Sequence, residues 1–345
     1  MSLLDSIIKF FLSLFGAKPQ PPTPPPASPP SPRPTIPPDS TTEPARIVTS
    51  KVLVIVYDPV VDSATGKTLS RHLGWSRPDD LITRYVDDIT ETSKGLARYQ
   101  IVQREDVDEF LPLEDGFRYT IDTYLSTFRR TTAPHSPDKL DYSAFLTRFN
   151  ILQRVANHEL DEVWVFSFPY AGFHESVMAG RGAFWCNSRP LPGTDSSSRR
   201  FIMMGFSLER GVGEMFESFT HRCESIMTKV YERTHGDANL YERFSRYDKQ
   251  NPGEAECGTV HFAPNSERDY DWKNPRFVAS KCDDWYNFPN FTGSTRQVNC
   301  VEWGNGDIRL HHLWWLDHFP RVSGRTNGIV HNWWQYVIDP NRVDV

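Results

Sequence analysis

The sequence lacks the short motifs that identify several common enzyme classes. It contains no GxSxG, no GxxxxGK[ST], no GxGxxG after a predicted strand and no HExxH. These motifs mark, in that order, serine hydrolases with a nucleophile elbow, nucleotide hydrolases, dinucleotide-binding enzymes and zinc peptidases with two histidines on one helix. Their absence makes each of these four classes a poor description of the chain.

Positive charge is neither abundant nor clustered. The 38 lysines and arginines are outnumbered by 44 aspartates and glutamates, which gives a formal net charge of -6, and the basic residues are spread along the chain. A surface that binds nucleic acid needs basic side chains gathered along the path of the phosphates. We therefore expect no nucleic acid among the partners.

The five cysteines contain no CxxC pair, so a closed zinc site built from thiolates is not expected. Four of them paired as disulfide bonds, with Cys223 left as a helical thiol, would fit an exported protein, whereas five reduced thiols would fit a cytosolic one. We favour export with disulfide bonds. The Asn290-Phe291-Thr292 sequence, which has the form of an N-glycosylation acceptor, also favours export.

The first 46 residues differ in composition from the rest. Residues 1–17 place polar side chains along one stripe of a helix opposite apolar ones, which predicts an amphipathic helix. This segment is too short and too charged for a good membrane span; contact with a membrane surface, docking on a partner and an atypical export signal are the alternatives. Residues 18–46 are rich in proline, which predicts an extended, disordered linker. Residues 47–345 are expected to form a single globular α/β domain.

Apolar runs alternate with helical patterns between residues 51 and 231. This alternation predicts an α/β layered fold with a central, mostly parallel sheet. Chemistry in such sheets is found beyond the C-terminal ends of strands, which here are followed by residues 169–188 and by SLERGVGEM after residue 206. The predicted strands cover residues 51–61, 99–103, 161–168 and 201–206, and the predicted helices cover residues 78–92 and 142–159 and the segment that follows Gly213.

From about residue 234 the sequence becomes rich in aromatic residues and in Asn, Asp and Gly, with little periodicity. This composition predicts a loop-rich aromatic C-terminal part. Asn305-Gly306 predicts a hairpin turn, and residues 310–320 predict a short helix. Five tryptophans in this part could form core or an exposed surface on which sugar rings stack: Trp303, Trp314, Trp315, Trp333 and Trp334.

The segment after Gly213 carries the densest group of chemically useful side chains. On a helix, Glu214, Glu217, His221 and Glu224 lie at i, i+3, i+7 and i+10 and share one face. Carboxylate and imidazole ligands suit a divalent metal, zinc or calcium, and Glu217, His221 and Glu224 are the expected ligands. A solvated face and a metal-free acid/base site are the alternatives. A further ligand is sought among residues elsewhere in the chain: His174, Glu175, His261, His311 and His312.

Glu175 is the second candidate for chemistry because it follows a predicted strand in an aromatic loop, PYAGFHES. A carboxyl group beside aromatic rings can have the raised pKa that a general acid needs. With Glu214 or Glu217 opposite, Glu175 could flank a glycosidic bond. His261 begins a segment with the spacing of a loose calcium loop, but this segment lacks the glycine and closing glutamate of an EF-hand.

Three segments carry a resemblance: RGVGEMFESFTHRCESIM, HFAPNSERDYDW and CDDWYNFPNF. They resemble a group of exported bacterial and microbial proteins to which no activity is attached, over residues 50–340. The resemblance implies a self-contained module that is often secreted. It implies nothing about which residues are functional.

The favoured interpretation is an exported or surface-tethered hydrolase that acts on an extracellular polymer, either glycan or peptide. Its site would combine Glu175, Glu214 and Glu217 with metal ligands from His221, Glu224, Glu217, His174 and His261. The alternative is a non-catalytic module of the cell surface that binds carbohydrate through exposed aromatic residues. In both cases residues 1–17 could contact a membrane surface.

Overall fold

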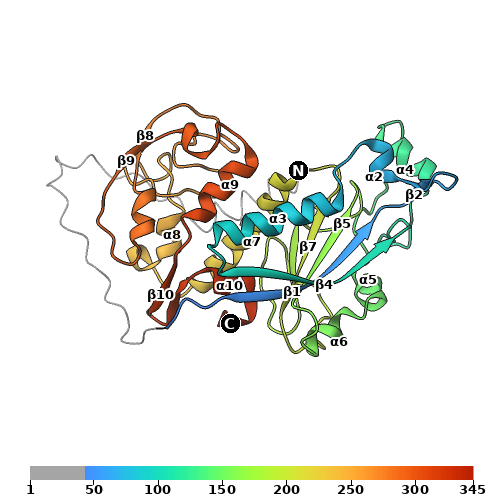
Figure 1. The fold of residues 1–345 in the computed structure, drawn as a ribbon, viewed down its shortest axis with the longest axis horizontal. Helices are drawn as coiled ribbons and strands as arrows, with labels where there is room; N and C mark the ends of the chain where they lie inside the picture. The colour runs from blue at the N-terminus through green and yellow to red at the C-terminus, as the bar shows by residue number, and fades with distance from the viewer. Residues whose placement is uncertain (1–42, 345) are drawn as a thin grey trace. The chain divides into compact units, whose positions relative to one another are not determined.

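The computed structural model describes residues 43–344, and its centre is a five-stranded sheet (Figure 1). The strand order is β4-β1-β5-β7-β6. The predicted α/β layered fold with a mostly parallel sheet is confirmed. Four strands run parallel, β1 (Val48–Tyr57), β4 (Ala97–Val107), β5 (Glu162–Ser167) and β7 (Phe201–Ser207), and β6 (Ser176–Ala179) runs antiparallel to β7.

Strand β1 is apolar without interruption from Val52 to Tyr57 because this part is buried on both faces of the sheet. Val52, Val54 and Val56 point into the core on one face of the sheet, and Leu53 and Ile55 point into the core on the other. The first face is covered by α3 (Pro78–Thr92) and α7 (Val212–Val230), and the second by α4 (Ile121–Phe128), α5 (Tyr142–Arg148) and α6 (Ile151–Ala156). A short helix, α2 (Leu69–Leu73), and the ladder of β2 (Val60–Asp62) with β3 (Lys67–Thr68) follow β1.

The C-terminal part extends the core beyond α7. Trp303, Trp315, Trp333 and Trp334 are each at most 1% exposed, so these four tryptophans are core and not a stacking surface. The elements of this part are α8 (Leu240–Phe244), β8 (Val278–Ser280), β9 (Arg296–Val298), α9 (Ile308–Asp317), β10 (Arg321–Thr326), β11 (Ile329–Asn332), α10 (Trp334–Ile338) and the 3-10 turns η1 (Gly236–Ala238), η2 (Cys282–Asn287), η3 (Cys300–Trp303) and η4 (Pro340–Arg342).

Three local predictions differ from the structure. The region 142–159 is two helices because Asn150 takes a left-handed conformation with φ of 50°. Residues 169–188, expected as a loop, contain strand β6. Asn305 and Gly306 both have positive φ, as a hairpin turn requires, but they join η3 to α9 and not two strands.

The predicted helix at residues 1–17 lies outside the described residues, as does the predicted linker up to residue 42. The last residues of that linker are part of the fold: the Glu43 carbonyl accepts a hydrogen bond from Gly324 N at 2.7 Å, and Asn332 Nδ2 donates to the Arg46 carbonyl at 3.1 Å. The folded part therefore starts before residue 47. Among the described helices, none combines the length and apolar character needed to cross a membrane.

The five cysteines are all buried and free in the structure. This disfavours the expected disulfide bonds. Cysteine usage therefore gives weaker support for export, and an extracellular location stays a prediction that also draws on the glycosylation-type sequence and the resemblance.

Candidate metal centre and adjoining pocket

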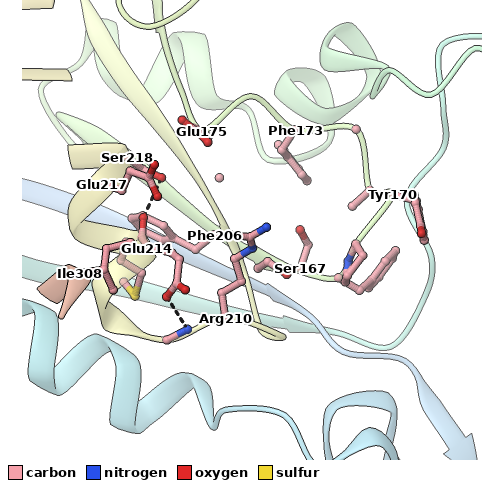
Figure 2. Close-up of a pocket in the computed structure, with 18 of the residues that line it drawn as sticks. Ser167, Tyr170, Phe173, Glu175, Phe206, Arg210, Glu214, Glu217, Ser218 and Ile308 are labelled. Atoms are coloured by element: carbon pink, nitrogen blue, oxygen red, sulfur yellow. Dashed lines mark hydrogen bonds between the residues drawn. The ribbon is translucent and has the colours of Figure 1, made fainter. Parts of the chain in front are cut away.

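A pocket of about 540 Å³ lies where the sheet rule predicts chemistry, at the C-terminal ends of β5 and β7. Residues 167–173, from the end of β5 onward, form one wall, and the end of β7 at Ser207 forms another together with Arg210. The first turns of α7 close the pocket, together with Tyr270 and Ile308. Figure 2 shows the Arg210 guanidinium pointing into the middle of the pocket.

Two glycines hold the wall after β5 in place. A Cβ on Gly172, whose φ is 79°, would lie 2.4 Å from the Asp138 carbonyl oxygen and from Leu140 N. A Cβ on Gly205 would lie 2.5 Å from the His174 carbonyl oxygen. Only glycine allows these backbone approaches without a shift. The loop that follows β5 therefore packs closely against the backbone of residues 138–140 on one side and of β7 on the other, and Glu175 faces the pocket.

The three predicted catalytic glutamates, Glu175, Glu214 and Glu217, all line this pocket. Glu214 has a structural role, because its Oε2 accepts a hydrogen bond from Gly211 N at 3.0 Å and so caps α7 (Figure 2). Glu175 is exposed, and its Oε2 accepts from Asn187 Nδ2 at 2.8 Å. Glu217 belongs to a cluster with two histidines.

Glu217, His221 and His261 each offer a ligand atom, and these atoms lie within 4.8 Å of one another. The Nε2 atoms of His221 and His261 are 3.0 Å apart, and Glu217 Oε1 is 3.4 Å from His261 Nε2. Glu217 and His221 lie one turn apart on α7, as the helical spacing predicts, and His261 comes from the loop after α8. The side chains of Glu217, His221 and His261 are 13%, 18% and 25% exposed.

A carboxylate contacts the Nδ1 atom of each histidine, on the side of the ring away from the facing Nε2 atoms. Glu224 Oε2 is 3.1 Å from His221 Nδ1, and Asp269 Oδ1 is 3.0 Å from His261 Nδ1. A carboxylate at Nδ1 favours a proton on that nitrogen and leaves the lone pair on Nε2. Two such lone pairs cannot face each other at 3.0 Å unless a cation, either a proton or a metal, lies between them. The distance between the two Nε2 atoms therefore fits either a shared proton in a hydrogen bond or a metal ion, and the cluster is a candidate metal centre.

The charges around the cluster keep Glu217 ionised. Burial alone would raise the pKa of Glu217, but the contact with His261, the hydrogen bond from Tyr270 and the nearby charge of His221 outweigh it and lower this pKa to about 2. Burial also opposes protonation of His221, but Glu224 and the neighbouring carboxylates raise its pKa overall. Burial, and then Glu217, raise the pKa of Tyr270, so its hydroxyl stays a donor to Glu217 at 2.8 Å.

His312 adds a third imidazole near the cluster. Its Nδ1 lies 2.6 Å from the Ile308 carbonyl, which leaves Nε2 buried without a hydrogen-bond partner among residues 43–344. Burial lowers the pKa of His312 to about 4, and Glu217, His221 and His261 all lie close enough to influence it. Helix α9 approaches this closely because α7 has Gly213 where a Cβ would lie 2.4 Å from Ile308 Cγ2.

Other predicted ligands are placed elsewhere. His174 is exposed and stacks on Tyr142, with 5.7 Å between ring centroids, and it does not line the pocket. Both carboxylate oxygens of Glu224 have hydrogen-bond partners. Oε2 is bonded to His221 Nδ1, and Oε1 accepts from Val260 N at 3.0 Å. In the segment expected to resemble a calcium loop, Asn265 donates to the carbonyls at residues 274 and 276, and Asp271 accepts from Glu267 N and Asn274. These polar groups do not converge on one point.

Asn187 and Tyr270 were not singled out from the sequence, whereas Arg210 was noted only as part of the turn before α7 and Asp269 only as part of the segment that resembles a calcium loop. They lie in aperiodic segments, in which spacing gives no information about direction. The closest signal was the density of acidic and aromatic residues after His261. Comparisons of this chain with protein-family models, with curated proteins and with solved structures found no match.

Proposed function

We propose that this protein is a metal-dependent hydrolase that cleaves amide bonds in a peptide substrate. The observation that carries the proposal is the pair of facing Nε2 atoms of His221 and His261, each backed by a carboxylate. Two imidazoles and one carboxylate are a common ligand set of catalytic zinc, which keeps a further position open for water. When bound, the metal would lower the pKa of its water ligand and polarise the substrate carbonyl.

The residues around the cluster have distinct positioning roles in this proposal. Glu217 stays ionised and offers a carboxylate oxygen. Glu224 and Asp269 hold the two imidazoles in the orientation and tautomer that present Nε2. Tyr270 lines the pocket and donates its one hydroxyl proton to Glu217, so it holds the Glu217 carboxylate in place beside the substrate.

Glu175 is the residue placed to act as the general base. It lines the same pocket as Glu217, and its negative charge contributes to raising the pKa values of His221 and Tyr270. Asn187 orients one oxygen of Glu175, which leaves the other to accept a proton from a water in the pocket. Arg210 makes no ion pair with another described residue, so its guanidinium is available to bind a carboxylate of the peptide.

Cleavage of a glycosidic bond is less well supported. That reaction needs one carboxyl group that is protonated at the start. The pKa of Glu217 is about 2, so Glu217 is not that group, and Glu214 is bonded to Gly211 N as the cap of α7. Glu175, the predicted general acid, is exposed and accepts a hydrogen bond from Asn187 Nδ2. A carbohydrate-binding module is also less well supported, because four of its expected stacking tryptophans are buried.

Loss of the histidine ligands tests the metal centre. We expect His221→Ala and His261→Ala each to lower the zinc content of the purified full-length protein by one ion per chain, measured by elemental analysis after dialysis. Hydrolysis of a peptide library should be lost in parallel. His174→Ala is the matched control, because His174 lies outside the cluster, and it should keep both zinc and activity.

Two results would contradict the proposal. Zinc content unchanged in both His221→Ala and His261→Ala would show that the cluster holds no metal. A zinc-loaded protein that cleaves no amide bond in the library would rule out peptide hydrolysis even if the metal centre is real.

A further inference from the structure

We infer that the protein has a second zinc site, away from the pocket, formed by Cys282, Asp283 and His318. Their ligand atoms, Sγ, Oδ1 and Nε2, lie within 4.8 Å of one another. Cys282 and Asp283 begin η2, and His318 is the C-cap residue that follows α9. The site joins two segments of the loop-rich C-terminal part, and it does not depend on the proposed hydrolase function.

His318 provides the strongest observation for this site. Its side chain is 1% exposed, and its Nδ1 lies 2.7 Å from the Trp314 carbonyl, so Nδ1 carries the proton and donates it. Nε2 is buried and has no hydrogen-bond partner among residues 43–344; the nearest carboxylate oxygen, Asp283 Oδ1, is 3.8 Å away. A buried imidazole nitrogen without a partner is destabilising, whereas a histidine with Nδ1 on a carbonyl and Nε2 free is a usual zinc ligand.

The His318 ring cannot readily turn away from this point. The rings of Tyr286 and Trp314 pack against the His318 ring at tilted angles, each with its centroid 4.5 Å from that of His318. Nε2 is therefore held toward the thiol and the carboxylate. This fixed direction is what distinguishes the cluster from an incidental group of polar side chains.

The other two ligands are also held in place. Cys282 Sγ lies 3.5 Å from Asp283 Oδ1, and the Cys282 side chain is buried. Arg296 donates to both oxygens of Asp283, from Nε at 2.5 Å and from Nη2 at 3.0 Å. Arg296 thus orients the carboxylate as outer partners orient ligating carboxylates.

The charges balance when a divalent ion is bound. Arg296 also contacts Glu302, with Nη1 2.7 Å from Oε1. With Cys282 as a thiolate, the group contains three negative charges, on Cys282, Asp283 and Glu302, and one positive charge on Arg296, so a dication makes it neutral. The thiol proton leaves to solvent as the Zn–S bond forms. The sulfur ligand favours zinc over calcium or magnesium.

Cobalt provides a direct test, because Co²⁺ bound by a thiolate absorbs in the near ultraviolet through ligand-to-metal charge transfer. The Glu217-His221-His261 cluster contains no sulfur, so this band reports the second site alone. We expect the metal-free full-length protein to develop the band when Co²⁺ is added, and we expect Zn²⁺ to abolish it by displacement.

The variants assign the band to residues. Cys282→Ser and His318→Gln should each lose the band and one bound zinc per chain. Cys300→Ser is the matched control, because Cys300 is another buried thiol and its nearest polar partner is Asn305 Oδ1 at 3.5 Å; it should keep both. His221→Ala should also keep the band, which separates this site from the proposed catalytic centre. Absence of the band in the wild-type chain, or its persistence in Cys282→Ser, would overturn the inference.

Discussion

Glu175→Gln is expected to lower kcat for peptide hydrolysis by about 10²- to 10⁴-fold, the usual contribution of a general base. The amide keeps the size of the side chain and can still accept the hydrogen bond from Asn187. It cannot accept a proton from water at neutral pH. Because Glu175 is not among the grouped ligand atoms, the zinc content should not change.

Glu214→Gln is the matched control for this experiment. Glu214 lines the same pocket, but its contact is the hydrogen bond from Gly211 N, which glutamine can also accept. The control should retain most of the activity. If the Glu175→Gln variant were as active as wild type, Glu175 would not be the base. If the variant lost both activity and bound zinc, Glu175 would be a metal ligand and not the base.

Arg222→Met is expected to lower the free energy of unfolding by about 3–5 kcal/mol, because it leaves a buried charge without its partner. Arg222 and Glu162 are 0% and 1% exposed, and Arg222 Nη1 is 2.6 Å from Glu162 Oε1. Arg222 also donates from Nε and Nη2 to the Val337 carbonyl, at 3.1 and 2.6 Å. The substitution therefore removes the ion pair between α7 and β5 and the hydrogen bonds between α7 and α10.

Urea unfolding followed by circular dichroism measures this loss. The double variant Glu162→Met, Arg222→Met removes both charges and should be more stable than Arg222→Met alone. Lys229→Met breaks an ion pair with Glu232 near the C-terminal end of the same helix, where the side chains are 24% and 38% exposed. This control should change stability by less than about 1 kcal/mol. An equally small effect of Arg222→Met would contradict the role of the buried pair.

The sheet was predictable because its strands carry their own signals. Strand β1 is buried on both faces and apolar from Val52 to Tyr57. Helix α3 begins at Pro78 with two acids in its first turn and ends at Thr92, as predicted. Strand β6 was missed because its four residues follow a glycine-containing loop and are too few to show a period. The Asn305-Gly306 pair shows that turn chemistry fixes the local backbone but not the elements on either side.

The candidate site was predictable where one helix determines it. Glu217 and His221 are neighbours because they are one turn apart on α7. The same rule suggested Glu224 as a ligand, but a side chain three residues from His221 can also bond to Nδ1 of that histidine, and spacing cannot distinguish the two. The loop residues Asp269 and Tyr270 are placed by tertiary contacts alone, which no local pattern encodes.

The attachment of residues 43–46 to the β10-β11 hairpin has a mechanical consequence. Gly324 N donates to the Glu43 carbonyl, and Arg325 pairs with Glu43 Oε2 at 2.5 Å. A pulling force applied through the chain before residue 43 would act first on these contacts and on the hairpin. Because β1 begins at Val48, directly after this segment, the force would reach the central sheet only once these contacts had broken.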